Sequence, residues 1–268
     1  MTRPSLPEEW KTVAQDIARA WIDQLCLPVP AHGPTNIATA YQLQEAILNH
    51  LKEPIGAWKV GINPDGGVWG SPLPCTALKT SHSLLSFPPG AIRGLEVELA
   101  FRLSPKVLEE KKPMSEETFL HEGILEMACA IEVVSSRFLG WPHIPEFWKL
   151  SDLQNHGALL LGSPAPYDPD FPYLTPPVSL QVGGNEQAKF PSGNPAGDPR
   201  TLLQPFLQQC RERGIPMEPH HWITTGSYSG VYFIKNSECI QATLGDLGPL
   251  TATLLSSSRE SATMDKSA

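Results

Sequence analysis

The sequence has no long apolar run and no excess of positive charge, and each absence excludes a class of protein. Among its 268 residues, no apolar stretch approaches the ~18 residues that a membrane-spanning helix needs. Its 28 Asp and Glu outnumber 20 Lys and Arg, which gives a formal net charge of −8. Proteins that bind nucleic acid or anionic membranes present excess basic residues. We therefore expect neither nucleic acid nor a membrane as a partner.

The sequence also lacks the cysteine pairs of metal ribbons and disulfide-rich domains. An odd number of scattered cysteines without a C-x-x-C pair indicates neither a zinc ribbon nor a disulfide framework. We interpret them as small buried hydrophobic residues. Residues 1–8 carry no apolar signal-peptide core, so we expect a cytoplasmic protein. The five cysteines are Cys26, Cys75, Cys129, Cys210 and Cys239.

Three widespread motifs are missing as well. No G-x-G-x-x-G follows a predicted strand, and there is no G-x-x-x-x-G-K-[ST] phosphate loop. The G-x-S-x-G turn that carries the nucleophile of many hydrolases is also absent. The usual sequence signs of nucleotide binding and of serine hydrolysis are therefore lacking.

The first element that the sequence predicts is a helix. Ser5 and Glu8 have capping-box spacing, and apolar residues recur at helical intervals over residues 10–21. A second helix is predicted over 36–52, before the helix-breaking Pro54 and Gly56. We therefore expect a small N-terminal helical region at residues 1–56.

From residue 57 the pattern changes to short apolar strands separated by Pro- and Gly-rich loops. Two further helices are expected at 115–127 and 198–214, the second kinked at Pro205. The mixture predicts an α+β fold with a β-rich domain at 57–255 and a disordered tail at 256–268. Loops are expected at 63–74 and 88–94, and strands at 57–61, 95–103, 130–134, 158–162, 178–182, 186–190, 221–225, 230–234, 240–244 and 250–255.

Glu96 and Glu98 stand two residues apart in the alternating strand 95–103. Side chains at i and i+2 of a strand point the same way, with Cα atoms about 7 Å apart. Two carboxylates held so close repel each other unless a cation or a proton lies between them. Carboxylate oxygens suit a hard ion such as Mg²⁺ or Mn²⁺. The alternative is the solvated face of a half-buried strand.

Two charged residues interrupt apolar segments. Glu132 lies within residues 128–134, and a buried carboxylate is costly unless it is paired. It is either a third metal ligand or the partner of Arg137 in an ordinary ion pair. Lys59 lies in the apolar segment 58–61. It either extends to water or lies beside the carboxylates, where it could bind an anion or donate a proton.

Polar turns next to two predicted strands supply the remaining candidates. The strand 158–162 is preceded by Asp152, Asn155 and His156. The strand 221–225 ends with Thr225 and Gly226. Such residues are either ordinary turn formers or groups that bind a substrate carboxylate.

Taken in order, the segments that contain these residues resemble the 2-keto-4-pentenoate hydratase group of the fumarylacetoacetate hydrolase superfamily. The resemblance covers roughly residues 37–255, and its most specific part is the E-x-E strand followed by a Glu in an apolar segment. The segments are W-K-V-G at 58–61, L-E-V-E-L-A-F at 95–101, A-I-E-V-V at 130–134, S-D at 151–152, G-D-P at 197–199 and T-T-G at 224–226.

The resemblance implies a fumarylacetoacetate hydrolase-like mixed β-sandwich or barrel core, with residues 57–255 as the catalytic domain. It implies a homo-oligomer with one Mg²⁺ or Mn²⁺ and a small 2-oxo or 2-hydroxy acid as substrate. The implied metal ligands are Glu96, Glu98 and Glu132, and Lys59 matches a lysine of the family. We predict Lys59 as the catalytic residue and, as substrate-binding residues, Asp152, Asn155, Thr225 and Gly226.

We therefore predict a metal-dependent hydratase that adds water to a 2-hydroxy-2,4-dienoate, such as 2-hydroxypenta-2,4-dienoate, in the catabolism of aromatic compounds. A 2-oxo acid decarboxylase or a C–C hydrolase of the same superfamily is an alternative, because each reaction needs an electron sink at C2. The chain departs from the group in its shortened, Pro-rich segment 62–78 and at Asn155, where a Ser is common. These departures motivate a further alternative, a binding protein or partner subunit without activity.

Overall fold

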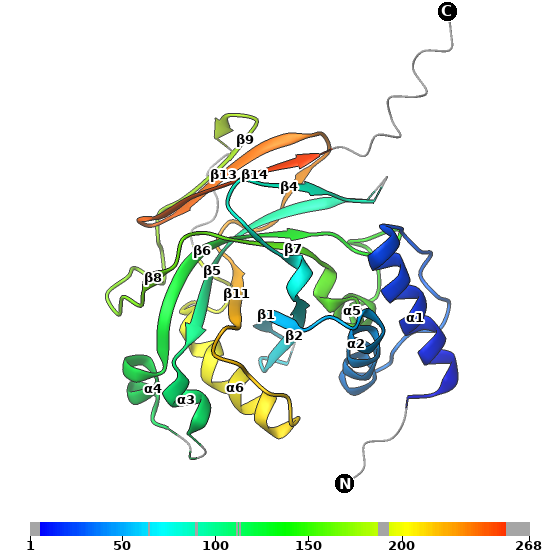
Figure 1. The fold of residues 1–268 in the computed structure, drawn as a ribbon, viewed down its shortest axis with the longest axis horizontal. Helices are drawn as coiled ribbons and strands as arrows, with labels where there is room; N and C mark the ends of the chain where they lie inside the picture. The colour runs from blue at the N-terminus through cyan, green and yellow to red at the C-terminus, as the bar shows by residue number, and fades with distance from the viewer. Residues whose placement is uncertain are drawn as a thin grey trace, which may run out of the picture.

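The computed structural model describes residues 6–63, 65–88, 91–110, 112, 114–186 and 193–255. A strongly curved larger sheet lies against a smaller sheet on one side, and α6 lies on its other side (Figure 1). The helices are α1 (Glu8–Asp23), α2 (Ile37–Leu51), α3 (Pro105–Glu109), α4 (Glu116–Glu122), α5 (Glu146–Ser151) and α6 (Leu203–Glu212). The predicted α+β class is confirmed.

The larger sheet contains strands from most of the chain, with β12 (Tyr232–Ile234) paired to β5 and β8 (Ala165–Pro166) paired to β6. Its order is β2 (Val68–Pro74), β1 (Ile55–Ile62), β11 (Trp222–Ser227), β5 (Arg93–Leu103), β6 (Ile124–Val134), β7 (His156–Leu161) and β3 (Leu78–Thr80). The smaller sheet has the order β10 (Asn185–Glu186), β9 (Val178–Val182), β13 (Glu238–Leu244), β14 (Leu247–Leu255) and β4 (Ser83–Ser86).

Alternation along β5 determines what lies on each side of the larger sheet. Leu95, Val97 and Leu99 point toward the smaller sheet and join the main apolar core. The other side is not the solvated face that the sequence left open as the alternative: Glu98 has no exposed surface, and Glu96 is only partly exposed. Apolar and polar side chains do alternate along β5 as predicted, but the side chains on both sides of this strand are largely buried.

The N-terminal helices α1 and α2 agree with the predicted segments. Asn36 caps α2 by accepting a hydrogen bond from the backbone of Thr39. At α1 the N-cap is Pro7 without a side-chain hydrogen bond, and Ser5 of the predicted capping box lies outside the described residues. The boundary at residue 56 and its use as a domain division stay predictions.

Several predicted elements are wrong in extent. The expected loop at 63–74 contains β2, whose Pro72 and Pro74 are tolerated because β2 is an edge strand. The helix expected at 115–127 ends at Gly123, and β6 begins directly afterwards.

The helix expected over 198–214 also differs in form. It begins as a 3₁₀ turn over Pro199–Leu202 and continues as α6. Pro205 falls in the first turn of α6, where a backbone N–H has no partner within the helix, and the kink expected at Pro205 stays a prediction. The predicted strand 186–190 and the tail 256–268 lie largely or wholly outside the described residues.

Two cysteines fit their predicted burial and one does not. Cys129 and Cys210 are buried, and burial raises the pKa of each thiol to about 12. Cys239 is exposed on β13, so the prediction is wrong there. In the described part of the chain, no helix has the length and apolar character needed to cross a membrane.

Candidate metal centre

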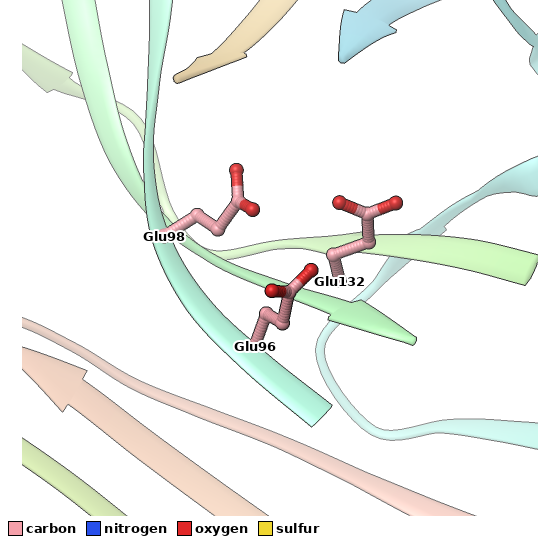
Figure 2. A group of neighbouring side chains, drawn as sticks. All are labelled: Glu96, Glu98 and Glu132. Carbon is pink, nitrogen blue, oxygen red and sulfur yellow. The ribbon is translucent and has the colours of Figure 1, made fainter. Parts of the chain in front are cut away.

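Three carboxylates converge on the side of the larger sheet that faces away from the smaller sheet. Glu96 and Glu98 share one side of β5, and the register of the β5–β6 pair sets Glu132 directly opposite Glu96. Figure 2 shows the three side chains directed toward a common point. One oxygen of each lies within 4.8 Å of the others, a spacing that one metal ion can bridge.

Their mutual repulsion is visible in their acid–base properties. Burial, followed by the negative charges of Glu132 and Glu96, raises the pKa of Glu98 well above its usual value. Burial also raises the pKa of Glu96. Although burial acts to raise the pKa of Glu132, the positive charge of Lys59 and the contact with His156 outweigh it and lower that pKa. Glu132 is therefore the carboxylate most firmly ionised.

Lys59 lies inside this cluster and does not extend to water. Its Nζ is 2.9 Å from Glu132 Oε2 and 3.4 Å from Glu96 Oε2, and its side chain is 16% exposed. Burial lowers the pKa of Lys59, but the surrounding carboxylates raise it more, so the amine is an ammonium. With three ionised carboxylates, the four side chains carry a formal charge of −2, which a single divalent cation would neutralise.

One buried oxygen of the cluster has no partner among the described residues. Glu98 Oε2 accepts a hydrogen bond from the backbone N–H of Gly226 at 3.2 Å, whereas Glu98 Oε1 is buried without a hydrogen-bond partner. Such an oxygen is costly unless a cation or another donor satisfies it. The residues present thus fit a hard divalent ion.

Gly226 and its neighbours support Glu98 from β11. Gly226 has a φ of 95°, a left-handed conformation that favours glycine, and this turns its N–H toward the carboxylate. The hydroxyl of Thr224 donates to the carbonyl of Trp58 at 3.4 Å, and its proximity to Glu98 acts to lower the pKa of that carboxylate. The predicted substrate-binding residue Thr225 points elsewhere and donates to the carbonyl of Leu99 at 3.1 Å. The two adjacent hydroxyls are equivalent in the sequence, which does not indicate the one that faces Glu98; substrate binding by Thr225 stays a prediction.

Arg137 does not serve as the alternative partner of Glu132. Its Nε donates to Asp152 Oδ1 at 2.6 Å, and Asp152 also accepts from the hydroxyl of Ser136 at 2.7 Å. Asp152 is wholly buried in these contacts. This environment favours a structural role, and substrate binding by Asp152 stays a prediction.

The turn that follows Asp152 is left-handed over three consecutive residues. Leu153, Gln154 and Asn155 have φ values of 50°, 55° and 58°, which is unfavourable for residues with a Cβ. With its amide oriented to satisfy its neighbours, Gln154 donates to the carbonyl of Lys59 at 3.0 Å. Asn155 Oδ1 is buried without a partner in the described part of the chain. This turn therefore contacts the backbone of β1, the strand that carries Lys59.

His156 is a site residue that sequence reasoning placed only in a turn. Its Nδ1 lies 3.0 Å from Glu132 Oε1, and both side chains have no exposed surface. Burial lowers the pKa of His156, which keeps the imidazole neutral. The only available signal was its position directly before the predicted strand 158–162.

Comparison with known proteins identifies the fold. No protein-family profile matches this chain, and no curated protein matches it in sequence. Among solved structures, 4-oxalocrotonate decarboxylase from Pseudomonas putida G7, complexed with magnesium and adipate, is similar with a TM-score of 0.75 and 14% identity. The match covers 95% of this chain and 100% of the decarboxylase.

Two further structures match a smaller part of the chain with lower TM-scores. A fumarylacetoacetate hydrolase family protein from Yersinia pestis CO92 has a TM-score of 0.52 and 18% identity, covering 76% of this chain and 95% of its own. Fumarylpyruvate hydrolase from Pseudomonas aeruginosa, with Mn²⁺ and pyruvate, has a TM-score of 0.51 and 16% identity, covering 76% of this chain and 91% of its own. The predicted fumarylacetoacetate hydrolase-like fold is therefore confirmed.

Proposed function

We propose that this chain, with its fumarylacetoacetate hydrolase fold, is a divalent-metal-dependent enzyme that acts on a small 2-oxo acid. The observation that carries the proposal is the buried convergence of Glu96, Glu98 and Glu132 around the ammonium of Lys59. Solved proteins of similar fold were crystallised with magnesium or Mn²⁺ and with small carboxylic acids. We assign Mg²⁺ or Mn²⁺ as the cofactor and the three glutamates as its ligands.

The reaction we propose first is hydration of a 2-hydroxy-2,4-dienoate or its 2-oxo tautomer. When bound, the metal ion polarises the oxygen at C2 of such a substrate as a Lewis acid. Lys59 supplies a positive charge for an anionic substrate and a proton at Nζ for the conjugated carbon chain. The buried walls around Glu98 and Glu132 exclude bulk water, which strengthens these electrostatic interactions.

Decarboxylation of a 2-oxo acid is the second candidate. It is favoured by the similarity to 4-oxalocrotonate decarboxylase, which extends over 95% of this chain. Loss of CO₂ and addition of water both draw electrons toward the oxygen at C2. The same arrangement of carboxylates and Lys59 serves either reaction.

The test follows two products with the Mn²⁺-loaded protein. Loss of the ultraviolet absorbance of 2-hydroxypenta-2,4-dienoate without CO₂ release supports the hydratase. CO₂ release from 4-oxalocrotonate supports the decarboxylase. Turnover that persists after complete chelation of the metal overturns the metal-dependent proposal. A protein that binds Mn²⁺ and leaves both substrates and a wider panel of 2-oxo acids unchanged is instead a binding protein of the same fold.

A further inference from the structure

The two oxygens of Glu132 have different neighbours. Oε2 faces Lys59 at 2.9 Å, within the cluster of carboxylates. Oε1 faces His156 Nδ1 at 3.0 Å. Because Glu132 is ionised, its oxygens can only accept hydrogen bonds, so Nδ1 of His156 carries the hydrogen and donates. The rotation of the Glu132 carboxylate is thereby fixed from one side by an imidazole and from the other by an ammonium.

The ring of His156 is itself held by the N-terminal helix α1. Trp21, near the end of α1, stacks on the imidazole with ring centroids 6.3 Å apart and an interplanar angle of 22°. The guanidinium of Arg137 lies 4.4 Å from the centre of the Trp21 ring on which it rests. Arg137 also donates to the backbone carbonyls of His156 and Asp152. These contacts leave the imidazole little freedom to rotate.

We propose that His156 is a positioning residue that holds Glu132 in its metal-binding orientation, and that Trp21 makes helix α1 a part of this support. The inference rests on the proposed metal site. Partners that orient a metal-binding side chain typically change metal affinity by about 10- to 100-fold when they are removed. The N-terminal helices would then contribute to metal binding although none of the three glutamates lies on them.

Two substitutions of nearly equal size separate the hydrogen bond from general packing. In His156→Asn the side-chain amide nitrogen can take the place of Nδ1, whereas in His156→Gln it lies nearer the place of Nε2. The dissociation constant of Mn²⁺, measured by calorimetry, should stay near the wild-type value in His156→Asn and rise by about 10- to 100-fold in His156→Gln. Trp21→Phe should retain the affinity, and Trp21→Ala should weaken it.

His221→Gln provides the matched control, because His221 is also buried but hydrogen bonds to Trp58 and not to a carboxylate of the cluster. It should bind Mn²⁺ as the wild type does. Equal affinity in wild type, His156→Gln and Trp21→Ala would overturn the positioning role while leaving the proposed function intact. If the wild-type protein itself does not bind Mn²⁺ or Mg²⁺, the proposed function fails, and the inference fails with it.

Discussion

We expect Glu98→Gln to stabilise the metal-free protein against unfolding. The same substitution should reduce the additional stability that the protein gains when it binds the metal. One oxygen of each carboxylate lies within 4.8 Å of the others, so a pair of ionised carboxylates repels by about 3.5 kcal/mol at an effective dielectric constant of about 20. Glutamine cannot ionise, so the variant avoids this repulsion where Glu98 is ionised and avoids the cost of keeping Glu98 protonated where it is not. Its side-chain oxygen can still accept the hydrogen bond from Gly226 that Glu98 Oε2 now accepts. The variant therefore lacks the repulsion but retains the packing.

The pH dependence follows from the raised pKa of Glu98. Above the unfolded-state pKa of about 4.5, the unfolded chain releases this proton while the folded protein retains it, so Glu98 destabilises the fold increasingly as pH rises. The cost grows by about 1.4 kcal/mol per pH unit until pH reaches the folded-state pKa. In the metal-free protein, the gain in unfolding free energy from Glu98→Gln should thus be large at pH 7.5 and vanish near pH 4.5.

Thermal unfolding with EDTA or with excess Mn²⁺ measures both effects. At pH 7.5 with EDTA, Glu98→Gln should unfold at a higher temperature than wild type, by roughly 2–4 °C per kcal/mol. With Mn²⁺ at about 100 times its dissociation constant, wild type should gain about 2.7 kcal/mol and the variant much less. Glu109→Gln, at an exposed site on α3, is the control and should change neither result. A variant that is less stable than wild type in EDTA and equally stabilised by Mn²⁺ would refute the reasoning.

Three further outcomes are expected. Apparent Mn²⁺ affinity should fall as pH falls, because the pKa values of Glu96 and Glu98 are raised and protons compete with the metal. Calorimetry in buffers of different ionisation enthalpy should detect the protons released when Mn²⁺ binds. Lys59→Met should lower kcat by about 10²- to 10⁴-fold without weakening Mn²⁺ binding, and a variant with unchanged kcat would exclude proton transfer by Lys59. Burial lowers the pKa of His221 to about 4, so the unfolded state takes up its proton first as pH falls. Relative to His221→Gln, wild type should therefore lose up to about 3 kcal/mol of unfolding free energy between pH 6.5 and 4, measured by urea denaturation.

Local pattern was sufficient for the parts of the site that depend on a single strand. The two-residue spacing of Glu96 and Glu98 places both on one side of β5 whatever lies around it. The apolar segment around Glu132 correctly indicated a buried carboxylate in need of partners. Its actual partners, Lys59 and His156, come from β1 and β7, on opposite sides of the β5–β6 pair. No local pattern specifies that arrangement.

The sequence alone does not determine which of several polar side chains face the site, because that depends on how the strands are arranged. Thr224 and Thr225 are adjacent hydroxyls on a strand, and only the position of β11 beside β5 determines that Thr224 faces Glu98. Asp152 looked available in a polar turn but is enclosed by Arg137 and Ser136. The strand β2 was missed because its prolines suggest a loop, and edge positions that tolerate proline are a property of the whole sheet.

The register between β5 and β6 is the feature on which the candidate site depends most. Glu132 is paired with Glu96, while Ile131 and Val133 of the same strand point into the core between the two sheets. A slip of one residue would turn Glu132 into that apolar core and Ile131 toward Lys59. The apolar residues of β6 therefore help to enforce the approach of two mutually repelling carboxylates, because a one-residue slip that turned Glu132 away from Glu96 would also turn Ile131 and Val133 out of the core. The main core thus holds in place an arrangement that is electrostatically unfavourable until a cation binds.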